Sequence, residues 1–357
     1  MKQKMNLKSG MFNGLPAYAC ALLLLAAGLV LSVLYAVTVG SAELSVGEVY
    51  RVILYELFRW GDPEQLGSGA VHDIVWLIRL PRVVLAVLVG MGLSVVGAVM
   101  QAIVKNPLAD PYVLGVSSGA KLVVGAVMIF GMKLWGRVPF GAVMTAAFIG
   151  AMLCAGFVML VSRKIHSMAM LLVVGMMVGN VCSAATDFFV TFARESDIAN
   201  LTSWSMGSFS AVSWGNLRVC SLVIAVCLLL CLLLAKPIGA YQFGEHYAAS
   251  MGVNVRRFRA ALIGLSCLLA ASVTALVGPI SFIGIAVPYM TKKLLGTAKP
   301  LAVLPGCFLL GGVFCMACDW IARTAFSPTE LAISTVTAFF GAPIVIVMAL
   351  KRGGGHR

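Results

Sequence analysis

Long apolar runs separated by short polar segments dominate this sequence and constrain what it can fold into. The runs lie at about 15–39, 80–104, 112–132, 138–161, 168–192, 217–235, 259–277, 280–295, 301–322 and 331–350. A helix needs about 20 apolar residues to cross the hydrocarbon core of a bilayer. We therefore expect an all-α polytopic membrane protein, a single transmembrane domain over residues 1–357 with about ten spans.

The composition favours a membrane protein over a soluble one. Hydrophobic residues make up 61% of the 357 residues and charged residues only 11%, which is more apolar surface than one soluble core of this size could bury. The first apolar run follows Lys2, Lys4 and Lys8. It is too long for the apolar region of a cleaved signal peptide, so we expect it to remain as the first span.

Lys and Arg residues are unevenly distributed between the loops. An even number of spans places both termini and every second loop on the same side of the membrane. That side holds sixteen of the 26 basic residues. Only Asp110 and Glu245 oppose them there. Because basic loops stay in the cytoplasm, we predict that both termini are cytoplasmic. The net charge of +13 then reflects membrane orientation, and we expect no nucleic-acid partner.

The sequence gives no pattern for catalysis or metal binding. Most of the ten cysteines lie inside apolar runs, where a free thiol packs as a small hydrophobe. Cys315 and Cys318 form a lone CxxC without the second pair that a zinc site needs. The string Gly115–Gly119 matches the G-x-S-x-G of serine hydrolases, but membrane helices flank it, and close helix packing explains it better. We expect no catalytic residue, no metal ligand and no phosphate loop.

Two prolines break the chain after the second span. Pro107 and Pro111 cannot continue a helix, and irregular backbone at membrane depth is tolerated only against protein or a water-filled path. The segment is therefore a candidate for the translocation pathway, with a plain cytoplasmic hairpin as the alternative. Lys121, inside the third span, either faces this pathway or extends to the cytoplasmic interface.

Arginines open the second span on the predicted external side. Arg79 and Arg82 lie one helical turn apart, which places them on the same face, and Pro81 between them suits a first turn. Cytoplasmic loops of membrane proteins carry most of the Lys and Arg residues, so arginines on the external side suggest a specific role. Guanidinium groups form paired hydrogen bonds with carboxylates, such as those of a docking partner. Extension to the membrane interface is the alternative interpretation.

Two short helices are expected outside the spans. In the cytoplasmic loop at about 236–258, residues 245–251 predict a short helix that ends at Gly252, where small side chains would let another protein approach. The external segment around 194–214 predicts an interfacial helix, with Trp204 and Trp214 at headgroup depth.

Taken in order, these strings resemble the FecCD-like permeases, the ATP-binding cassette (ABC) importer subunits for ferric siderophores, haem and vitamin B12. The matching strings are Arg79–Arg82, Gly97–Gln101, Asn106–Pro111, Leu114–Ala120, Gly244–Gly252, Gly278–Gly284, Val287–Tyr289 and Gly341–Pro343. Each string alone is weak evidence, whereas the ordered set covers nearly the whole chain.

The resemblance implies a type II ABC-importer permease fold and a multi-pass location in the bacterial cytoplasmic (inner) membrane. It also implies a homodimer around a central pathway, two cytoplasmic ATPase subunits and an external substrate-binding protein. ATP and Mg would bind to the ATPases, and no cofactor to this chain, which would not be an enzyme. The resemblance favours a ferric siderophore as the metal chelate, because that is the commonest role in the family, while haem and cobalamin are also compatible.

The resemblance assigns three groups of site residues. Docking to glutamates of the binding protein is implied for Arg79, Arg82 and Arg323. The cytoplasmic gate is implied for Asn106, Leu108, Ser167 and Met168, where Met168 replaces a small polar residue of one relative. Contact with the ATPase is implied for the helix that contains Glu245, Ala248, Ala249 and Gly252.

An ion-gradient-driven secondary transporter is the alternative function. Such a protein would require acidic residues near the middle of the membrane. Only Asp187 and Asp319 come near, and both are expected toward the external ends of their spans. The sequence therefore favours the ABC permease.

Overall fold

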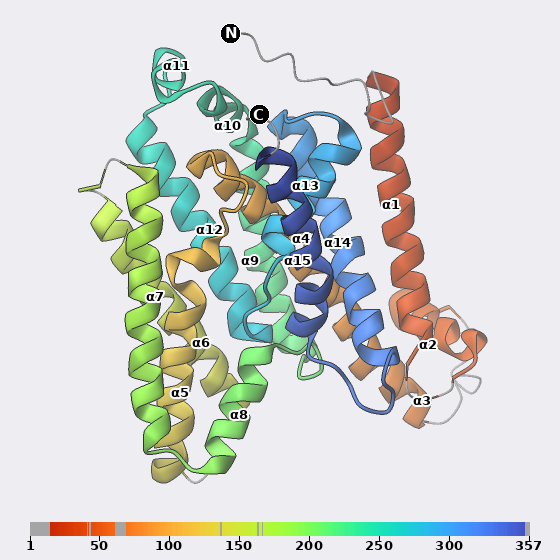
Figure 1. Ribbon diagram of the computed structural model, residues 1–357. Helices are drawn as coiled ribbons and strands as arrows, with labels where there is room; N and C mark the ends of the chain where they lie inside the picture. The colour runs from red at the N-terminus through yellow and green to blue at the C-terminus, as the bar shows by residue number, and fades with distance from the viewer. Residues whose placement is uncertain are drawn as a thin grey trace.

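The computed structural model describes residues 15–40, 42, 44–60, 69–135, 138–162, 164–165 and 167–353. The three N-terminal lysines noted above lie outside this part of the chain. All regular structure within the described residues is helical, and the long helices run between two ends of one bundle (Figure 1). We call these the α11 end and the α8 end, after the short helices found there.

Ten helices correspond to the ten apolar runs. They are α1 (Leu15–Thr38), α4 (Leu80–Val104), α5 (Val116–Trp135), α6 (Phe140–Ser162), α7 (Met168–Thr191), α9 (Trp214–Leu233), α12 (Val255–Val277), α13 (Ile283–Leu295), α14 (Pro300–Thr324) and α15 (Ile333–Gly353). Among the described residues, eight helical segments are long and apolar enough to cross a membrane. The apolar part of α5 is shorter, and α13 has only 13 residues. The predicted polytopic helical fold is therefore confirmed, with α5 and α13 as two shorter helices.

Shorter helices cap both ends of the bundle. The α8 end carries α2 (Val46–Phe58), α3 (Gly69–Asp73), the π-helical turn η2 (Ile74–Arg79) and α8 (Glu195–Met206). The α11 end carries the 3₁₀ turn η3 (Pro111–Leu114), α10 (Ala235–Gln242) and α11 (Glu245–Ser250). The predicted helices α8 and α11 are thus confirmed. Sequence analysis missed α10, whose Pro237 lies in the first turn, where its missing N–H is tolerated.

Helix α4 occupies the centre of the bundle. The span that contains it is 83% buried over its most apolar window, because small residues let neighbouring backbones approach closely. A Cβ atom on Gly90 would collide with the Gly311 carbonyl of α14, and one on Gly97 with the Gly284 carbonyl of α13. Ser94 Oγ also donates to the Cys307 carbonyl at 2.7 Å. The core is therefore built on backbone contacts of α4.

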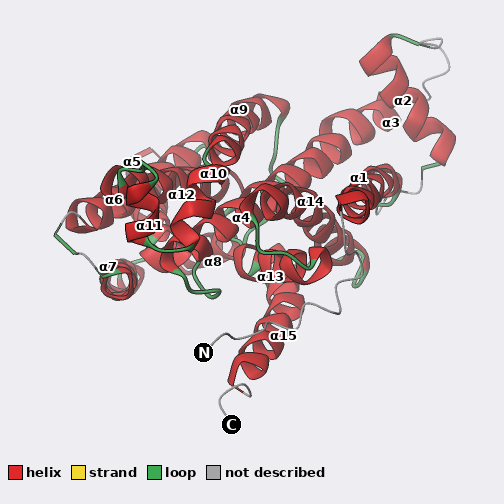
Figure 2. Cartoon of the chain, turned by 90° about the horizontal axis from the view of Figure 1, so that it is seen from above, coloured by secondary structure: helices red, strands yellow, loops and turns green. Residues whose placement is uncertain are grey.

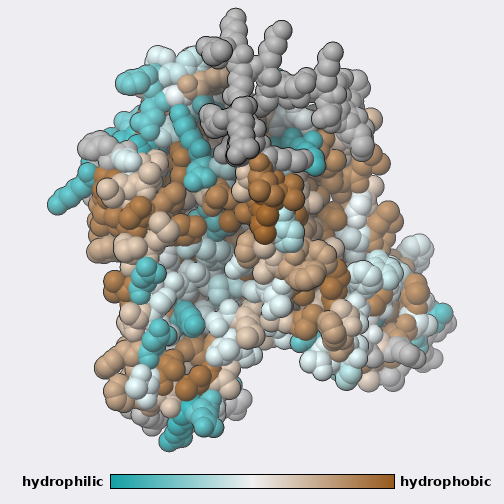
Figure 3. Space-filling view, in the orientation of Figure 1, coloured by the Kyte–Doolittle hydropathy of each residue, from teal (hydrophilic) through white to brown (hydrophobic). Residues whose placement is uncertain are grey.

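Three spans are largely uncovered by the rest of the chain. Only 17% of the apolar window of α1, 22% of that of α7 and 28% of that of α15 is buried, and all three lie at the periphery in the view along the bundle (Figure 2). On the face seen in Figure 3, apolar side chains cover much of the surface, with a paler band of small and polar residues between α7 and α15. These helices must meet lipid or other protein chains.

Candidate functional site

A buried carboxylate joins two of the predicted docking arginines at the α8 end. Asp319, on α14, has a fully buried side chain. Arg82 of α4 donates from Nε to Asp319 Oδ1 at 3.0 Å, and Arg323 Nε pairs with Asp319 Oδ2 at 3.0 Å. Arg82 Nη1 also contacts both carboxylate oxygens of Glu330, each at 3.0 Å. The four side chains form a charge-balanced cluster.

The end of α1 occupies the remaining arginine donors. Arg79 donates to the carbonyls of Val37 and Thr38 at 3.2 and 2.8 Å. Arg323 donates to the carbonyls of Val39 and Ala36 at 3.0 and 3.2 Å. The last carbonyls of a helix have no partner within it, so these two arginines serve as the C-terminal cap of α1.

The three arginines implied to dock a partner are therefore internal in this chain. Arg79 is 4% exposed, Arg82 7% and Arg323 8%. Arg79 and Arg82 also point to different partners, although their spacing predicted a shared face. Sequence analysis missed Glu330 as a member of the cluster, because a loop acid after α14 carries no spacing signal toward α4.

The predicted gate segment is a tight turn between α4 and α5 at the α11 end. Lys105 ends α4 in the left-handed conformation, with φ of 55°. Asn106 Oδ1 accepts the backbone N–H of Leu108 at 3.0 Å, an arrangement that fixes the turn. The Leu108 side chain is 43% exposed. The segment thus presents an apolar side chain on a turn that is held by a side-chain hydrogen bond.

Asp110 holds the second half of this turn. Its buried carboxylate accepts the N–H of Tyr112 at 2.8 Å and so caps η3. Burial away from water raises the pKa of Asp110 to about 6, because desolvation disfavours the charged form. After η3, Gly115 with φ of 82° lies against the α7 backbone at Gly175 and Gly179. The turn is therefore packed directly on α7.

The other predicted gate residues lie at the same end but make their hydrogen bonds locally. Ser167 is the N-cap of α7, and its Oγ accepts the N–H of Met170 at 3.4 Å. Met168 is half-buried at the first position of α7, and Lys121 is half-buried on α5. The structure brings Asn106 and Leu108 into one turn and keeps Ser167 and Met168 in a separate one.

The predicted ATPase-contacting helix is α11. Glu245 begins it and accepts from Tyr241 Oη of α10 at 2.8 Å and from Arg259 Nη1 of α12 at 3.3 Å. Ala248 is fully buried and packs inward, whereas Ala249 and Gly252 are exposed, with a φ of 84° at Gly252. Ala248 therefore supports α11 from within, and its methyl group is not available to a partner.

An exposed apolar surface beside α11 was missed by sequence analysis. Phe243 is 82% exposed, Tyr247 49% and Met251 65%, and the first two rings pack with centroids 5.5 Å apart. Their spacing of four residues would have placed them on one helical face. Exposed apolar patches of this kind mark interaction surfaces.

Helix α7 carries polar residues on a surface that the chain leaves open. Asn180, Ser183 and Asp187 are all exposed, at spacings of three and four residues. Such spacing places them on one face of the helix. Polar and ionisable groups within a span face a water-filled cavity or another protein chain and not lipid. The face of α7 that bears them is therefore a candidate pathway wall.

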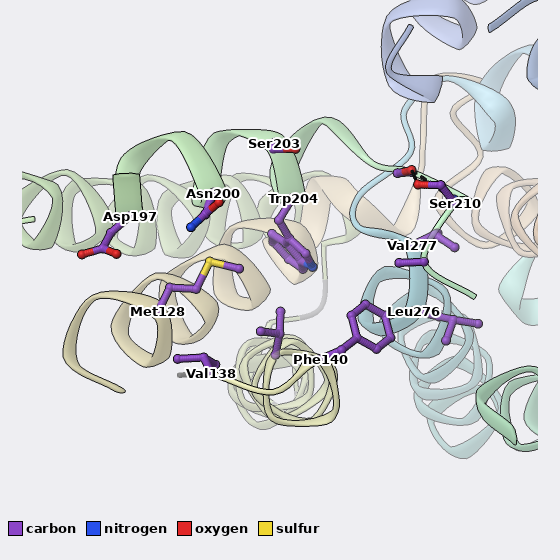
Figure 4. Close-up of a pocket in the computed structure, with 13 residues that line it drawn as sticks. Met128, Val138, Phe140, Asp197, Asn200, Ser203, Trp204, Ser210, Leu276 and Val277 are labelled. Carbon is purple, nitrogen blue, oxygen red and sulfur yellow. Dashed lines mark hydrogen bonds between the residues drawn. The ribbon is translucent and has the colours of Figure 1, made fainter. Parts of the chain in front are cut away.

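A separate cavity of about 390 Å³ lies at the α8 end. Asp197, Asn200 and Trp204 of α8 form one wall, and Met128 of α5 and Phe140 of α6 face them (Figure 4). One wall is thus largely polar and the other apolar. The cavity includes none of the residues predicted for docking, gating or ATPase contact.

Comparisons with known proteins find relatives over most of the chain. The FecCD transport family model matches residues 28–351. The hemin transport system permease protein HmuU of Yersinia pestis is 35% identical over 292 residues, which cover 80% of this chain and 87% of HmuU. The vitamin B12 import system permease protein BtuC of Yersinia pseudotuberculosis is 34% identical over 328 residues, which cover 92% of each chain.

Solved structures share the fold. One described as an inward-facing metal-chelate type ABC transporter has a TM-score of 0.79 at 26% identity and covers 93% of this chain and 99% of that chain. PsaBC from Streptococcus pneumoniae in complex with Fab has a TM-score of 0.51 at 14% identity over 85% of this chain, a likeness of fold alone.

Proposed function

The chain belongs to the FecCD transport family, and from this premise we propose that two copies form the pathway by which a binding-protein-dependent ABC importer moves a metal chelate. The chain itself is a multi-pass membrane permease of the metal-chelate type ABC importers. Our proposal adds the homodimer, two ATPase subunits at the α11 end and a substrate-binding protein at the α8 end. It also places both termini in the cytoplasm.

The open polar face of α7 is the observation that carries the proposal. Asn180, Ser183 and Asp187 are exposed on a span of which only 22% is buried within the chain. Contact of these groups with lipid would leave their hydrogen bonds unmade, at a cost of several kcal/mol for each group. A second copy that faces α7 across a water-filled path would hydrate them. The sparse polar lining suits a wide pathway that binds its cargo weakly.

A gate and a coupling surface lie together at the α11 end. The gate is the turn at Asn106 and Leu108, with Ser167 and Met168 at the start of α7. Lys121, near this end of α5, would attract an anionic chelate. The ATPase would contact α11 and the exposed side chains of Phe243, Tyr247 and Met251, because apolar residues with a polar rim are typical of protein interfaces.

The substrate we propose is a ferric siderophore, with haem and cobalamin as the competing chelates. The described residues contain no group of three or more His, Cys, Asp and Glu side chains that could hold a metal ion. A permease that recognises an intact chelate has no need of such ligands. Specificity would then reside in the substrate-binding protein.

Transport in proteoliposomes tests the proposal. The permease would be reconstituted with its ATPase and binding protein, and uptake of a ferric siderophore, haem and cobalamin measured separately. We expect uptake of one chelate that requires both ATP and the binding protein. Uptake that follows a proton or sodium gradient without ATP would overturn the proposal and support a secondary transporter.

A further inference from the structure

We propose that the cavity at the α8 end binds an organic cation, in the form of a primary ammonium group carried on an apolar body. This site goes beyond the proposed function, because binding there requires neither an ATPase nor a binding protein. The observation that carries it is a carboxylate that is buried beside the cavity without a partner.

Asp197 is the acidic residue of this cavity, which it lines from the first turn of α8. It is 3% exposed, and its carboxylate has no hydrogen bond or salt bridge to the other described residues. Burial of a charge without a partner is costly. A cation from outside the chain would supply the missing counter-charge.

The helix dipole does not account for the burial of this acid. An acid in the first turn interacts favourably with the helix N-terminus, but Glu195 does so from an exposed position. Asp197 shares one face of α8 with Asn200 and Trp204, at spacings of three and four residues. This face is turned toward Met128 of α5 across the cavity (Figure 4). The carboxylate is thus directed to the space between α8 and α5.

Further hydrogen-bond acceptors line the same cavity. The exposed side chains of Asn200 and Ser203 have no hydrogen bond to the other described residues, and the hydroxyl oxygens of Ser208 and Ser210 lie 2.6 Å apart. An ammonium group has three N–H donors and no acceptor, so a carboxylate with amide and hydroxyl oxygens near it is a complementary set. The described lining residues include no Lys, Arg or His, which disfavours an anionic ligand.

The opposite wall and the volume favour an organic cation over a bare metal ion. Met128 and Phe140 offer an apolar surface, and Trp204 adds an aromatic ring, whose face attracts an ammonium group. The volume of about 390 Å³ is in the range of small-molecule sites. The described residues also form no group of three or more His, Cys, Asp and Glu side chains that could hold a metal ion.

A ligand in this cavity would hold the start of α8 against α5 and α6. The other end of α8 is already tied to α12, because the Ser208 N–H donates to the Val277 carbonyl at 2.9 Å. Occupancy would therefore restrain chiefly the first turns of α8, around Asp197.

Calorimetric titration of the permease in phosphatidylcholine nanodiscs with 2-phenylethylammonium tests the site, with empty nanodiscs as the blank. The matched neutral probe is 2-phenylethanol, which we expect to bind about tenfold more weakly. Asp197→Asn should weaken binding of the ammonium about ten- to hundredfold, because a charge-assisted hydrogen bond is lost, and should leave binding of the alcohol unchanged. Glu195→Gln, which neutralises the exposed acid of the same turn, is the matched control and should bind like wild type.

Asn200→Ala provides a second variant, with an expected loss of about threefold in affinity for the ammonium, and thermal unfolding shows whether each variant is folded. Equal affinity of wild type for the ammonium and the alcohol would overturn this inference. Equal affinity of wild type and Asp197→Asn for the ammonium, or no binding by wild type, would do the same.

Nanodiscs that contain phosphatidylethanolamine distinguish the two sources of such a group. An apparent affinity for 2-phenylethylammonium that is lower in these nanodiscs would show that the lipid's own ammonium competes for the site. An unchanged affinity would assign the site to a soluble amine. The readout is independent of transport, so its failure would leave the proposed function intact.

Discussion

The ammonium of Lys105 lies 5.6 Å from the ring centre of Tyr241. This cation–π contact connects the end of α4, directly before the gate turn, with α10. Tyr241 Oη in turn donates to Glu245 of α11 at 2.8 Å. A continuous set of contacts therefore runs from the proposed ATPase surface to the proposed gate.

This connection predicts that Tyr241→Phe and Lys105→Gln reduce the coupling of transport to ATP hydrolysis. Tyr241→Phe keeps the ring but loses the bond to Glu245, and Lys105→Gln removes a contact worth about 0.5–2 kcal/mol. We expect ATP hydrolysis to persist while chelate uptake per ATP falls several-fold, as measured in proteoliposomes. Thr145→Ala on α6, an exposed residue whose hydroxyl donates to carbonyls of its own helix, is the control, and equal uptake per ATP in all four proteins would contradict the prediction.

Asp319→Asn is expected to destabilise the permease severely. The change leaves Arg82 and Arg323 buried without their shared counter-charge, and removal of one partner of a buried ion pair costs about 3–5 kcal/mol. Thermal unfolding in detergent should show a large decrease in midpoint. Glu330→Gln provides the comparison, because Glu330 is half exposed and its loss should change the midpoint little. Similar midpoints for Asp319→Asn and wild type would show that Asp319 does not hold the cluster together.

Gly90→Ala should weaken the packing of α4 against α14. The added methyl group would meet the Gly311 backbone, and overpacking of a close contact costs about 1–3 kcal/mol. Gly156→Ala in α6 is the matched control, because a Cβ there meets nothing within 4 Å and alanine favours the helix. Thermal unfolding of both variants checks the prediction, which fails if the two changes have the same effect.

Asn180→Cys should react with a membrane-impermeant thiol reagent if α7 lines a water-filled pathway. The background would carry Cys20→Ser, because Cys20 is the exposed cysteine among the described residues. Leu229→Cys on α9, where Leu229 is 57% exposed on an apolar span, should be protected by lipid. Labelling yields by mass spectrometry compare the two sites. Equal labelling would place the polar face of α7 outside the pathway.

Asp110 predicts a pH dependence of stability. Its pKa is raised from 3.8 to about 6 by burial, so ionisation disfavours the folded state on the order of 3 kcal/mol above pH 6. This penalty shrinks as the pH falls from 6 toward 3.8. Asp110→Asn retains the cap on Tyr112 without the charge.

We therefore expect Asp110→Asn to unfold at a higher temperature than wild type at pH 7.5, with a smaller difference at pH 5. Parallel unfolding midpoints across this range would show that Asp110 carries no such penalty.

The polytopic helical class and the ten apolar helices, eight of which lie in segments long and apolar enough to span among the described residues, could be predicted from the sequence because they follow from local properties. The lengths of the apolar runs, the prolines at 107 and 111 and the glycine at 252 determine where helices begin and end. Helix α10 was not predicted, because Pro237 in its first turn suggested a loop. The exposure of Phe243, Tyr247 and Met251 was missed, although their spacing was visible in the sequence.

What the sequence alone determined is a helical membrane permease with a broken segment after α4 and a short helix near residue 245. Only the tertiary structure decided what the three arginines do. Their roles depend on Asp319, Glu330 and the carbonyls of α1, which lie up to 287 positions away along the chain. No helical period or local preference encodes such pairings, because they arise when packed helices bring donors and acceptors together in a space that excludes water.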